Sequence, residues 1–273
     1  MKPDNLIVID HVTFGYDASR TVLRDISLSF RRGQVTSLLG GSGCGKTTLL
    51  RLIGGVHAPN QGRVIFDGNV IDPRNKDQLH GLRRRLGMLF QFGALFTDLT
   101  VFENVAFPLR EHAGLPEAMV RDIVLMKLNA VGLRGAAGLR ISEVSGGMAR
   151  RVALARAIAL DPELIMYDEP FAGLDLISMG VASKLIRTLN DVTGATSLVV
   201  SHDVAECMAI SDHVVLMATG GRIVAQGTPA ELMASTDAEV RQFVRGEPDG
   251  PVKFHYPAPE IGVDFGLHAE AAP

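Results

Sequence analysis

The chain has 273 residues, of which 47% are hydrophobic and 21% charged, and its formal net charge at pH 7 is −3. These values indicate one large or two small globular domains with a sizeable core, and the charge gives no reason to expect a nucleic-acid partner. No apolar run is long enough to cross a bilayer, and the N-terminus lacks a secretory pattern. The two cysteines, Cys44 and Cys207, indicate no disulfide framework and favour a reducing cytoplasm.

The N-terminal part is predicted to contain mainly strands. Apolar and polar residues alternate in part over residues 6–14 and 21–30, and residues 63–71 have the pattern of a hairpin. The hairpin is expected to turn at Asp67-Gly68-Asn69. An apolar run over 34–40 leads through glycines into a helical pattern over 46–55.

The middle of the chain is predicted to be more helical. Thr100 with Glu103 indicates a capping box, and Pro116 indicates a helix that ends near Gly132. Apolar segments then alternate with helical ones: residues 164–169, 196–202 and 213–220. This alternation predicts a parallel sheet covered on both faces.

The C-terminal end combines one helix with a tail. Thr228, followed by Pro229 and Glu231, indicates the start of a helix. Residues 246–273 are rich in proline and glycine and show no periodicity, so we expect a tail.

A glycine-rich segment, GGSGCGKTT, matches the phosphate-binding pattern G-x-x-x-x-G-K-[ST] between a predicted strand and a predicted helix. The predicted nucleotide-binding residues of this P-loop are Gly40, Gly41, Ser42, Gly43, Cys44, Gly45, Lys46, Thr47 and Thr48. Glycines let backbone N–H groups face a polyphosphate, and the helix N-terminus adds partial positive charge. Lys46 is predicted to reach the β- and γ-phosphates, and Thr47 to contact Mg²⁺. The alternative is a glycine-rich turn with a capping threonine.

The apolar segment LIMYDEP ends in two carboxylates, which are costly at a buried strand end unless a cation is present. Asp168 is a candidate Mg²⁺ ligand, and Glu169 can polarise the attacking water. His202 ends another apolar segment and is a candidate to bond the γ-phosphate or to hold Glu169 and water. Gln91 is a candidate contact to Mg²⁺ or water. The alternatives are two acids that cap the next helix and a structural histidine.

Six segments in one order carry a resemblance: GGSGCGKTT, FQ, VSGGM, LIMYDEP, AGLD and VVSHD. The chain resembles the ATP-binding subunit of ABC transporters over about residues 6–245. The resemblance implies an α/β fold: a P-loop (RecA-like) ABC ATPase core, an antiparallel β subdomain and an inserted α-helical subdomain over about 91–160. Residues 1–245 would then be the ATP-binding domain, and 246–273 the tail.

The same resemblance implies an Mg²⁺-dependent ATPase. Tyr16 matches the aromatic residue that stacks on adenine. Gln91 matches the glutamine that links the nucleotide site to the membrane subunits, and Asp175 matches the acid of the D-loop, which communicates between subunits.

The segment VSGGM resembles the family signature, in which a second copy of the chain packs head to tail on the first. Ser145, Gly146 and Gly147 would present a hydroxyl and N–H groups to the γ-phosphate held by the other copy. Met148 replaces the usual glutamine and cannot make its hydrogen bonds, so we expect it to pack.

Longer segments resemble the ATPase of Mla-type (MCE-associated) phospholipid transport systems: FQFGALFTDLTVFENVAFPLRE, SGGMARRVALARAIALDPELIMYDEPFAGLD and PVKFHYPAP. This resemblance implies phospholipid transport between the inner and outer membranes. The implied partners are a transmembrane permease, an MCE lipid-binding protein and a small STAS-domain subunit, and the implied location is the cytoplasmic face of the inner membrane. The tail would pack on the neighbouring ATPase or remain untethered. The alternatives are amino-acid import and efflux of solvents or other hydrophobic compounds.

Three further positions depart from common ABC sequences. Gly41 replaces a frequent proline and adds flexibility, and Leu176 stands where a proline often follows the D-loop acid. Cys44 lies inside the P-loop, either as a small filling residue or as an exposed thiol that makes the ATPase thiol-sensitive.

Overall fold

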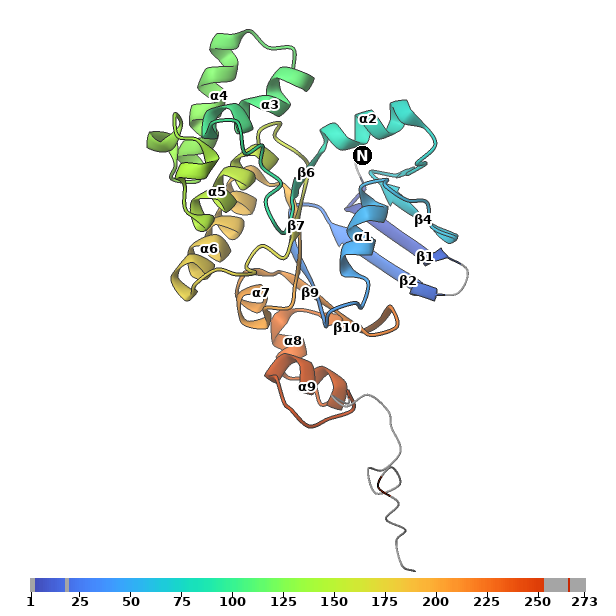
Figure 1. Ribbon diagram of the computed structural model, residues 1–273. Coiled ribbons are helices and arrows are strands. Elements are labelled where there is room, and N and C mark those ends of the chain that lie inside the picture. The colour runs from blue at the N-terminus through green and yellow to red at the C-terminus, as the bar shows by residue number, and fades with distance from the viewer. Residues whose placement is uncertain (1–2, 18–19, 253–264, 266–273) are drawn as a thin grey trace, which may run out of the picture.

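The computed structural model describes residues 3–17, 20–252 and 265 (Figure 1). Within these residues, four antiparallel strands form one sheet in the order β2 (Arg20–Arg31), β1 (Asn5–Asp17), β4 (Gln61–Phe66) and β5 (Asn69–Val70). Six strands form the other sheet in the order β10 (Arg222–Gly227), β9 (His213–Ala218), β3 (Val35–Gly40), β8 (Thr196–Ser201), β7 (Leu164–Asp168) and β6 (Leu86–Leu89).

The six-stranded sheet is parallel from β6 to β9, and β10 pairs with β9 in the antiparallel sense. All residues of β3, β7 and β8 are buried, because both faces of the sheet are covered. Successive residues point to opposite faces. Leu198 and Val200 of β8 therefore belong to one hydrophobic cluster, whereas Val199 belongs to the other.

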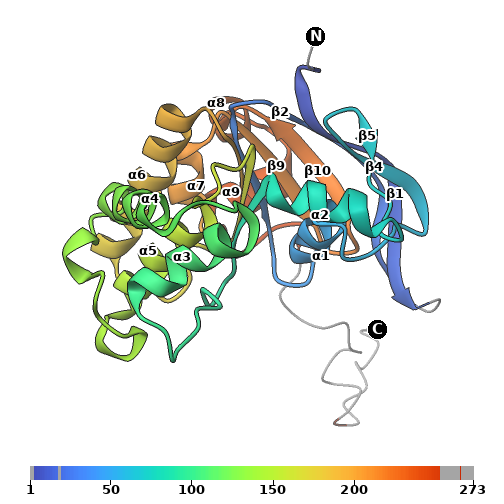
Figure 2. The same cartoon turned by 90° about the horizontal axis from the view of Figure 1, so that it is seen from above.

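The helices cover the parallel sheet on two sides (Figures 1 and 2). Their bounds are α1 (Lys46–Ile53), α2 (Lys76–Arg84), α3 (Val101–His112), α4 (Glu117–Ala130), α5 (Gly146–Ala157), α6 (Leu176–Thr193), α7 (Val204–Ile210), α8 (Pro229–Met233) and α9 (Ala238–Arg245). Short 3₁₀ turns occupy Arg134–Ala136 and Ile141–Glu143. Helix α1 lies between the two sheets, and α3 to α6 lie beyond the opposite face of the parallel sheet.

Each face of the parallel sheet has its own hydrophobic core. Leu49 and Ile53 of α1 pack in one cluster with Ile9 and Phe30 of the antiparallel sheet. The other cluster joins α3, α4 and α5 to the second face and includes the fully buried Tyr167. Because α1 is enclosed between the sheets, its N-terminus is held at the end of β3.

The local predictions for turns and caps are largely confirmed. Asn69 pairs with Phe66, so the hairpin turn is Asp67-Gly68, and both residues have positive φ angles, 50° and 79°. Thr100 accepts a hydrogen bond from the N–H of Glu103 at 3.1 Å, which is half of the predicted capping box.

The cap at the start of α8 is complete. Thr228 accepts from the N–H of Glu231, and the Glu231 carboxylate accepts from the N–H of Thr228, as a capping box requires. Helix α2 was not predicted, although Asn75 caps its first turn by accepting from the N–H of Gln78 at 3.1 Å.

The tail is described only at its start. Gln242 of α9 donates to the carbonyl of Val252 at 2.9 Å and accepts from its N–H at 2.8 Å, which fixes the chain there. The expected packing of the tail on a neighbouring ATPase concerns positions outside the described residues. Across the part of the chain that the structure describes, no helix combines the length and apolarity needed to span a membrane.

Candidate functional site

The P-loop joins the end of β3 to the start of α1, as the sequence predicts. Gly43 and Gly45 have φ angles of 76° and 103°, a region that disfavours side chains. A Cβ at Gly40 would lie 2.4 Å from the carbonyl oxygen of Met217, so that position is restricted as well. Helix α1 has no side-chain cap, because its N-cap residue is Gly45. The N–H groups of its first turn are therefore available to an anion.

Lys46 extends back across the loop. Its Nζ donates to the carbonyls of Gly40 at 2.7 Å and Gly41 at 3.1 Å, and it lies 3.8 Å from Oε1 of Glu169. Only 7% of the Lys46 side chain is exposed. The ammonium group is therefore held at the loop beside a carboxylate, where it can bind phosphate oxygens.

Cys44 differs from one of the two expectations. Its side chain is fully buried, and burial raises the pKa of the thiol. A buried thiol with a raised pKa is a poor nucleophile. The expectation of an exposed, reactive cysteine is thus wrong, and Cys44 packs in the core cluster that contains α1.

A cavity of about 500 Å³ opens above the P-loop. This P-loop cavity is lined by Tyr16, Asp17, Arg20, Val22, Ser42, Gly43, Gly45, Lys46, Thr47, Thr48, Gln91 and Glu169. It therefore brings the loop together with predicted residues from three other segments of the chain.

Tyr16 lies at the rim of the P-loop cavity and is 52% exposed. Its hydroxyl lies 3.2 Å from Oγ1 of Thr48 and accepts a hydrogen bond from Arg51 at 3.1 Å. Its ring makes edge contacts with Phe14 and His57 at centroid separations of 5.1 and 5.5 Å. These contacts fix an aromatic ring beside the phosphate loop.

Asp168 ends β7 beside α1. Its Oδ1 accepts a hydrogen bond from Thr47 at 3.1 Å, and burial raises the pKa of its carboxyl group. Thr47 belongs to the lining of the P-loop cavity, whereas Asp168 does not. A buried carboxylate and a hydroxyl in contact are hard oxygen donors of the kind that Mg²⁺ prefers.

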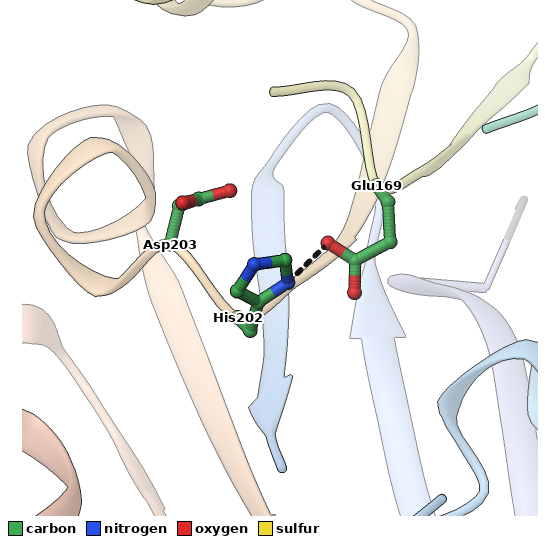
Figure 3. A group of neighbouring side chains, drawn as sticks. All are labelled: Glu169, His202 and Asp203. Carbon is green, nitrogen blue, oxygen red and sulfur yellow. Dashed lines mark hydrogen bonds and ion pairs between the residues drawn. The ribbon is translucent and has the colours of Figure 1, made fainter. Parts of the chain in front are cut away.

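Glu169 is held in an unusual backbone conformation, with a φ angle of 50°. Its N–H donates to the carbonyl of Val200 at 2.8 Å, which ties the end of β7 to β8. Its carboxylate accepts from Nδ1 of His202 at 2.8 Å (Figure 3). It also accepts from the Ser201 hydroxyl at 3.2 Å. The predicted pairing of His202 with Glu169 is therefore present in the geometry.

Ser201 and Asp203 complete this group and were not predicted from the sequence. The Ser201 hydroxyl lies 3.0 Å from Oδ2 of Asp203 as well as near Glu169. Glu169, His202 and Asp203 each place one possible metal-ligand atom within 4.8 Å of the others. The hydrogen bonds within the group already account for this proximity, so we interpret these side chains as holding the Glu169 carboxylate in place. Ser201 is the last residue of the buried strand β8 and directly precedes His202, and this position is the signal from which its role could have been predicted.

The signature residues form a separate cavity of about 490 Å³ at the start of α5. This α5 cavity is lined by Ser145, Gly146, Gly147, Met148, Arg150, Arg151, Gly173, Leu174, Asp175, Ile177, Ser178, Val181 and Ala182. The two cavities share no lining residue. One copy of the chain thus does not bring Ser145 or Asp175 to its own P-loop cavity.

Helix caps shape the α5 cavity. Ser145 caps α5 by accepting from the N–H of Met148 at 3.2 Å. Asp175 caps α6 by accepting from the N–H of Ser178 at 3.0 Å, and hydrogen bonds from Ser178 lower the pKa of its carboxyl group. Met148 is half-buried and packs against the hydrophobic core, as expected.

The fold and the P-loop together define an ATP-binding cassette. The family described as "ABC transporter" matches residues 23–172, and the chain belongs to this family. It is accordingly an ATPase subunit of an ABC transporter.

Three relatives show which ATP-binding proteins the chain resembles in sequence. Two carry the name "Intermembrane phospholipid transport system ATP-binding protein MlaF". The protein from Haemophilus influenzae is 55% identical over 93% of this chain and 96% of its own length. The protein from Escherichia coli K12 is 54% identical over 96% of both. A Mycobacterium tuberculosis protein named "Probable ribonucleotide transport ATP-binding protein mkl" is 38% identical over 90% of this chain and 68% of its own length.

Solved structures confirm the predicted α/β cassette fold. CbiO1 of Clostridium perfringens, part of an ABC transporter complex, has a TM-score of 0.80 and 30% identity over 90% of this chain and 96% of its own. The ATP-binding cassette MJ0796, in a dimeric post-hydrolysis state bound to ADP and Pi, has a TM-score of 0.74 and 28% identity over 82% of this chain and 98% of its own.

Proposed function

We propose that this chain hydrolyses ATP to drive phospholipid transport between the inner and outer membranes. The observation that carries the proposal is its 54–55% identity to two intermembrane phospholipid transport ATP-binding proteins over nearly the full length. The phosphate-binding geometry supports the ATPase step, and the relatives' names support the lipid substrate.

ATP would occupy the P-loop cavity. Tyr16 would stack on adenine, since stacking needs no particular base edge. The N–H groups of the P-loop and α1 would bind the phosphates together with Lys46. These contacts would leave the γ-phosphate facing Glu169, which also lines the cavity.

Mg²⁺ would be held by Thr47, Asp168 and Gln91. The oxygen donors fit a hard cation, and the buried carboxylate of Asp168 gains a counter-ion when the metal binds. The ion would neutralise developing charge on the phosphates.

Glu169 would accept a proton from the attacking water. His202 and Ser201 hold Oε2 of its carboxylate at 2.8 and 3.2 Å, so that Oε1, beside Lys46, can face the cavity. His202 would thus orient the base rather than replace it.

A second copy of the chain would complete each site. The α5 cavity contains N–H donors at a helix start, with a serine and two glycines, but lies apart from the P-loop cavity of the same copy. In a head-to-tail pair, Ser145, Gly146 and Gly147 of one copy would contact the γ-phosphate on the other. Asp175, in the same cavity, would relay contacts between the copies. Hydrolysis would remove the bridging phosphate and let the pair open.

The domain division follows the same assignment. Residues 1–245 would form the ATP-binding domain, with the helical subdomain over about 91–160 and a tail over 246–273. Helices α3, α4 and α5 pack on one another within that range, which supports a helical unit.

Membrane subunits would hold the chain at the cytoplasmic face of the inner membrane. The proposed partners are a transmembrane permease, an MCE lipid-binding protein and a small STAS-domain subunit. A cavity of about 370 Å³ beside α1 and β6 exposes apolar side chains, including Phe90 and Val56, and reaches Thr47 and Asp168. A permease segment bound there, next to Gln91, could sense the nucleotide.

The test is to purify the chain from membranes with its native partners, identify those proteins and bound lipids by mass spectrometry, and measure ATP-dependent lipid transfer. We expect phospholipid in the complex and transfer that stops in the Glu169→Gln variant. Recovery with an amino-acid permease, or with no lipid and no transfer, would reject the lipid function. The 38% identity to a protein named for ribonucleotide transport makes a different solute the second candidate.

A further inference from the structure

Arg150 makes contacts that connect the α5 cavity to two segments of the P-loop cavity. It follows the signature residues on α5 and lines the α5 cavity. Its guanidinium donates to the carbonyls of Pro170 at 2.6 Å, Ala172 at 2.9 Å and Gln91 at 2.8 Å. Pro170 directly follows Glu169, and Gln91 lines the P-loop cavity. One side chain is thus bonded to both segments.

Arg150 is half-buried, and none of the ion pairs among the described residues includes it. Burial lowers its pKa, although an arginine remains charged. A guanidinium offers five donors in a rigid plane, and here three of its bonds go to backbone oxygens. The position of the Arg150 side chain therefore depends on the two loops, and the positions of the loops depend on Arg150.

Arg156, two turns further along α5, holds the same loop after Gln91. It donates to the carbonyls of Gly93 at 2.7 Å and Ala94 at 2.8 Å. Both loop residues have positive φ angles, 71° and 48°, and the latter is unusual for a residue with a side chain. The first part of the loop is thus bound to α5 at Gln91, Gly93 and Ala94.

We propose that Arg150 is a positioning residue that keeps Glu169 and Gln91 aligned with the signature helix of the same copy. We assign it no catalytic role, because its hydrogen bonds go to backbone carbonyls of Pro170, Ala172 and Gln91. When a second copy's nucleotide binds at Ser145, the resulting position of α5 is transmitted through Arg150 to this copy's Glu169. The inference rests on the proposed paired-site ATPase and adds the connection between its two sites.

The test uses the full chain assembled with its native partners and the variants Arg150→Gln and Arg150→Lys. We expect Arg150→Gln to lower kcat about ten- to hundredfold, the scale of a small misplacement of reacting groups. The KM for ATP should stay within about threefold, since the phosphate contacts are intact. Arg150→Lys keeps the charge but loses the planar geometry, and should recover part of kcat.

A matched control is Arg187→Gln. Arg187 of α6 also bonds a backbone carbonyl, that of Ile210 at 3.3 Å, and pairs with Asp212, away from both cavities. This control should retain kcat within about twofold, as expected for a contact far from the ATP site. Equal kcat losses in Arg150→Gln and Arg187→Gln, or a rise in KM without a loss of kcat, would overturn the inference.

A double-variant cycle separates positioning from a merely structural role. Because Arg150 acts through Glu169, Arg150→Gln should add little to the loss of Glu169→Gln. Losses that multiply would contradict the inference. If Arg150→Gln does not fold, Arg150→Lys supports the same cycle. If the wild-type complex hydrolyses ATP and the Arg150 variants have the same kcat, this inference alone is rejected. If the wild-type complex does not hydrolyse ATP, the proposed function is rejected.

Discussion

The P-loop cavity and the α5 cavity have nearly equal volumes, about 500 and 490 Å³, but different chemistry. The first holds a buried cation, Lys46, in place beside a carboxylate, Glu169. The second offers a half-exposed helix start whose serine and aspartate are already occupied as helix caps. The first cavity can bind a polyphosphate by itself, whereas the second provides only donors for a phosphate that something else carries. Unequal halves of this kind suit a site divided between two copies.

The largest effect is expected from Glu169→Gln, which tests the chemistry of the P-loop cavity. Glutamine keeps the shape but cannot accept the proton of water, so kcat should fall by about 10² to 10⁴, the usual contribution of a general base. ATP binding should persist and leave a long-lived closed pair. Steady-state hydrolysis and nucleotide trapping measure the two effects, and wild-type turnover would remove Glu169 from the role of base.

Ser145→Arg tests the α5 cavity. The bulky cation should block the approach of the other copy's γ-phosphate and lower hydrolysis by about 10²-fold, comparable to the loss of an oxyanion donor. ATP binding by a single copy should be unchanged, because Ser145 lies outside the P-loop cavity. Ser142→Arg is the control, since Ser142 is exposed nearby and does not line either cavity. Loss of ATP binding in Ser145→Arg but not in the control would contradict the separation of the cavities.

Asp168→Asn should improve stability while it impairs function. Burial raises the folded-state pKa of Asp168 above its unfolded value, so the ionised carboxylate disfavours folding at neutral pH. Asparagine keeps an oxygen that can accept from Thr47, and the ligand-free chain should gain about 1 kcal/mol. Mg²⁺-dependent hydrolysis should fall. Thermal unfolding without nucleotide measures the first effect, and a lower melting temperature would show that the charge is compensated.

The smallest effect is expected far from both cavities, in the cap of α8. Thr228→Ala should cost about 1 kcal/mol of stability and leave ATP hydrolysis unchanged.

The hydrogen bonds at this cap lower the folded-state pKa of Glu231 below its unfolded value. The stabilisation by its carboxylate is therefore present above the unfolded pKa and is lost as the pH falls through the folded pKa. The unfolding free energies of the wild-type protein and Glu231→Gln should therefore converge as the pH falls through the acidic range. A difference that widens toward low pH would show that the pKa of Glu231 is not lowered by folding.

The sequence allowed prediction of the features that depend on local geometry. The P-loop, the Asp67-Gly68 turn and the Thr228 cap each follow from residues within one turn or loop. The sequence offered two roles for His202, a bond to the γ-phosphate or support of Glu169, and the pairing with Glu169 is the one present in the structure. The contacts of Arg150, the burial of Cys44 and the placement of Asp175 beside Ser145 depend on how distant segments pack. No local pattern encodes those contacts, and an arginine in a helical segment gives no sign of which carbonyls it will contact.

In the proposed assembly, each ATP site combines the P-loop cavity of one copy with the α5 cavity of another. Assemblies with two distinguishable copies test it under single-turnover conditions. In one assembly, the first copy carries Lys46→Ala and the second carries Ser145→Arg. In the other, a single copy carries both substitutions and its partner is wild type.

We expect ATP hydrolysis to survive at one site when the substitutions lie on different copies, because the intact P-loop then faces an intact Ser145. We expect no hydrolysis when both lie on one copy, because each site then lacks one half. The reverse pattern, with hydrolysis only when a wild-type copy is present, would place both halves of the site in one chain and contradict the shared site.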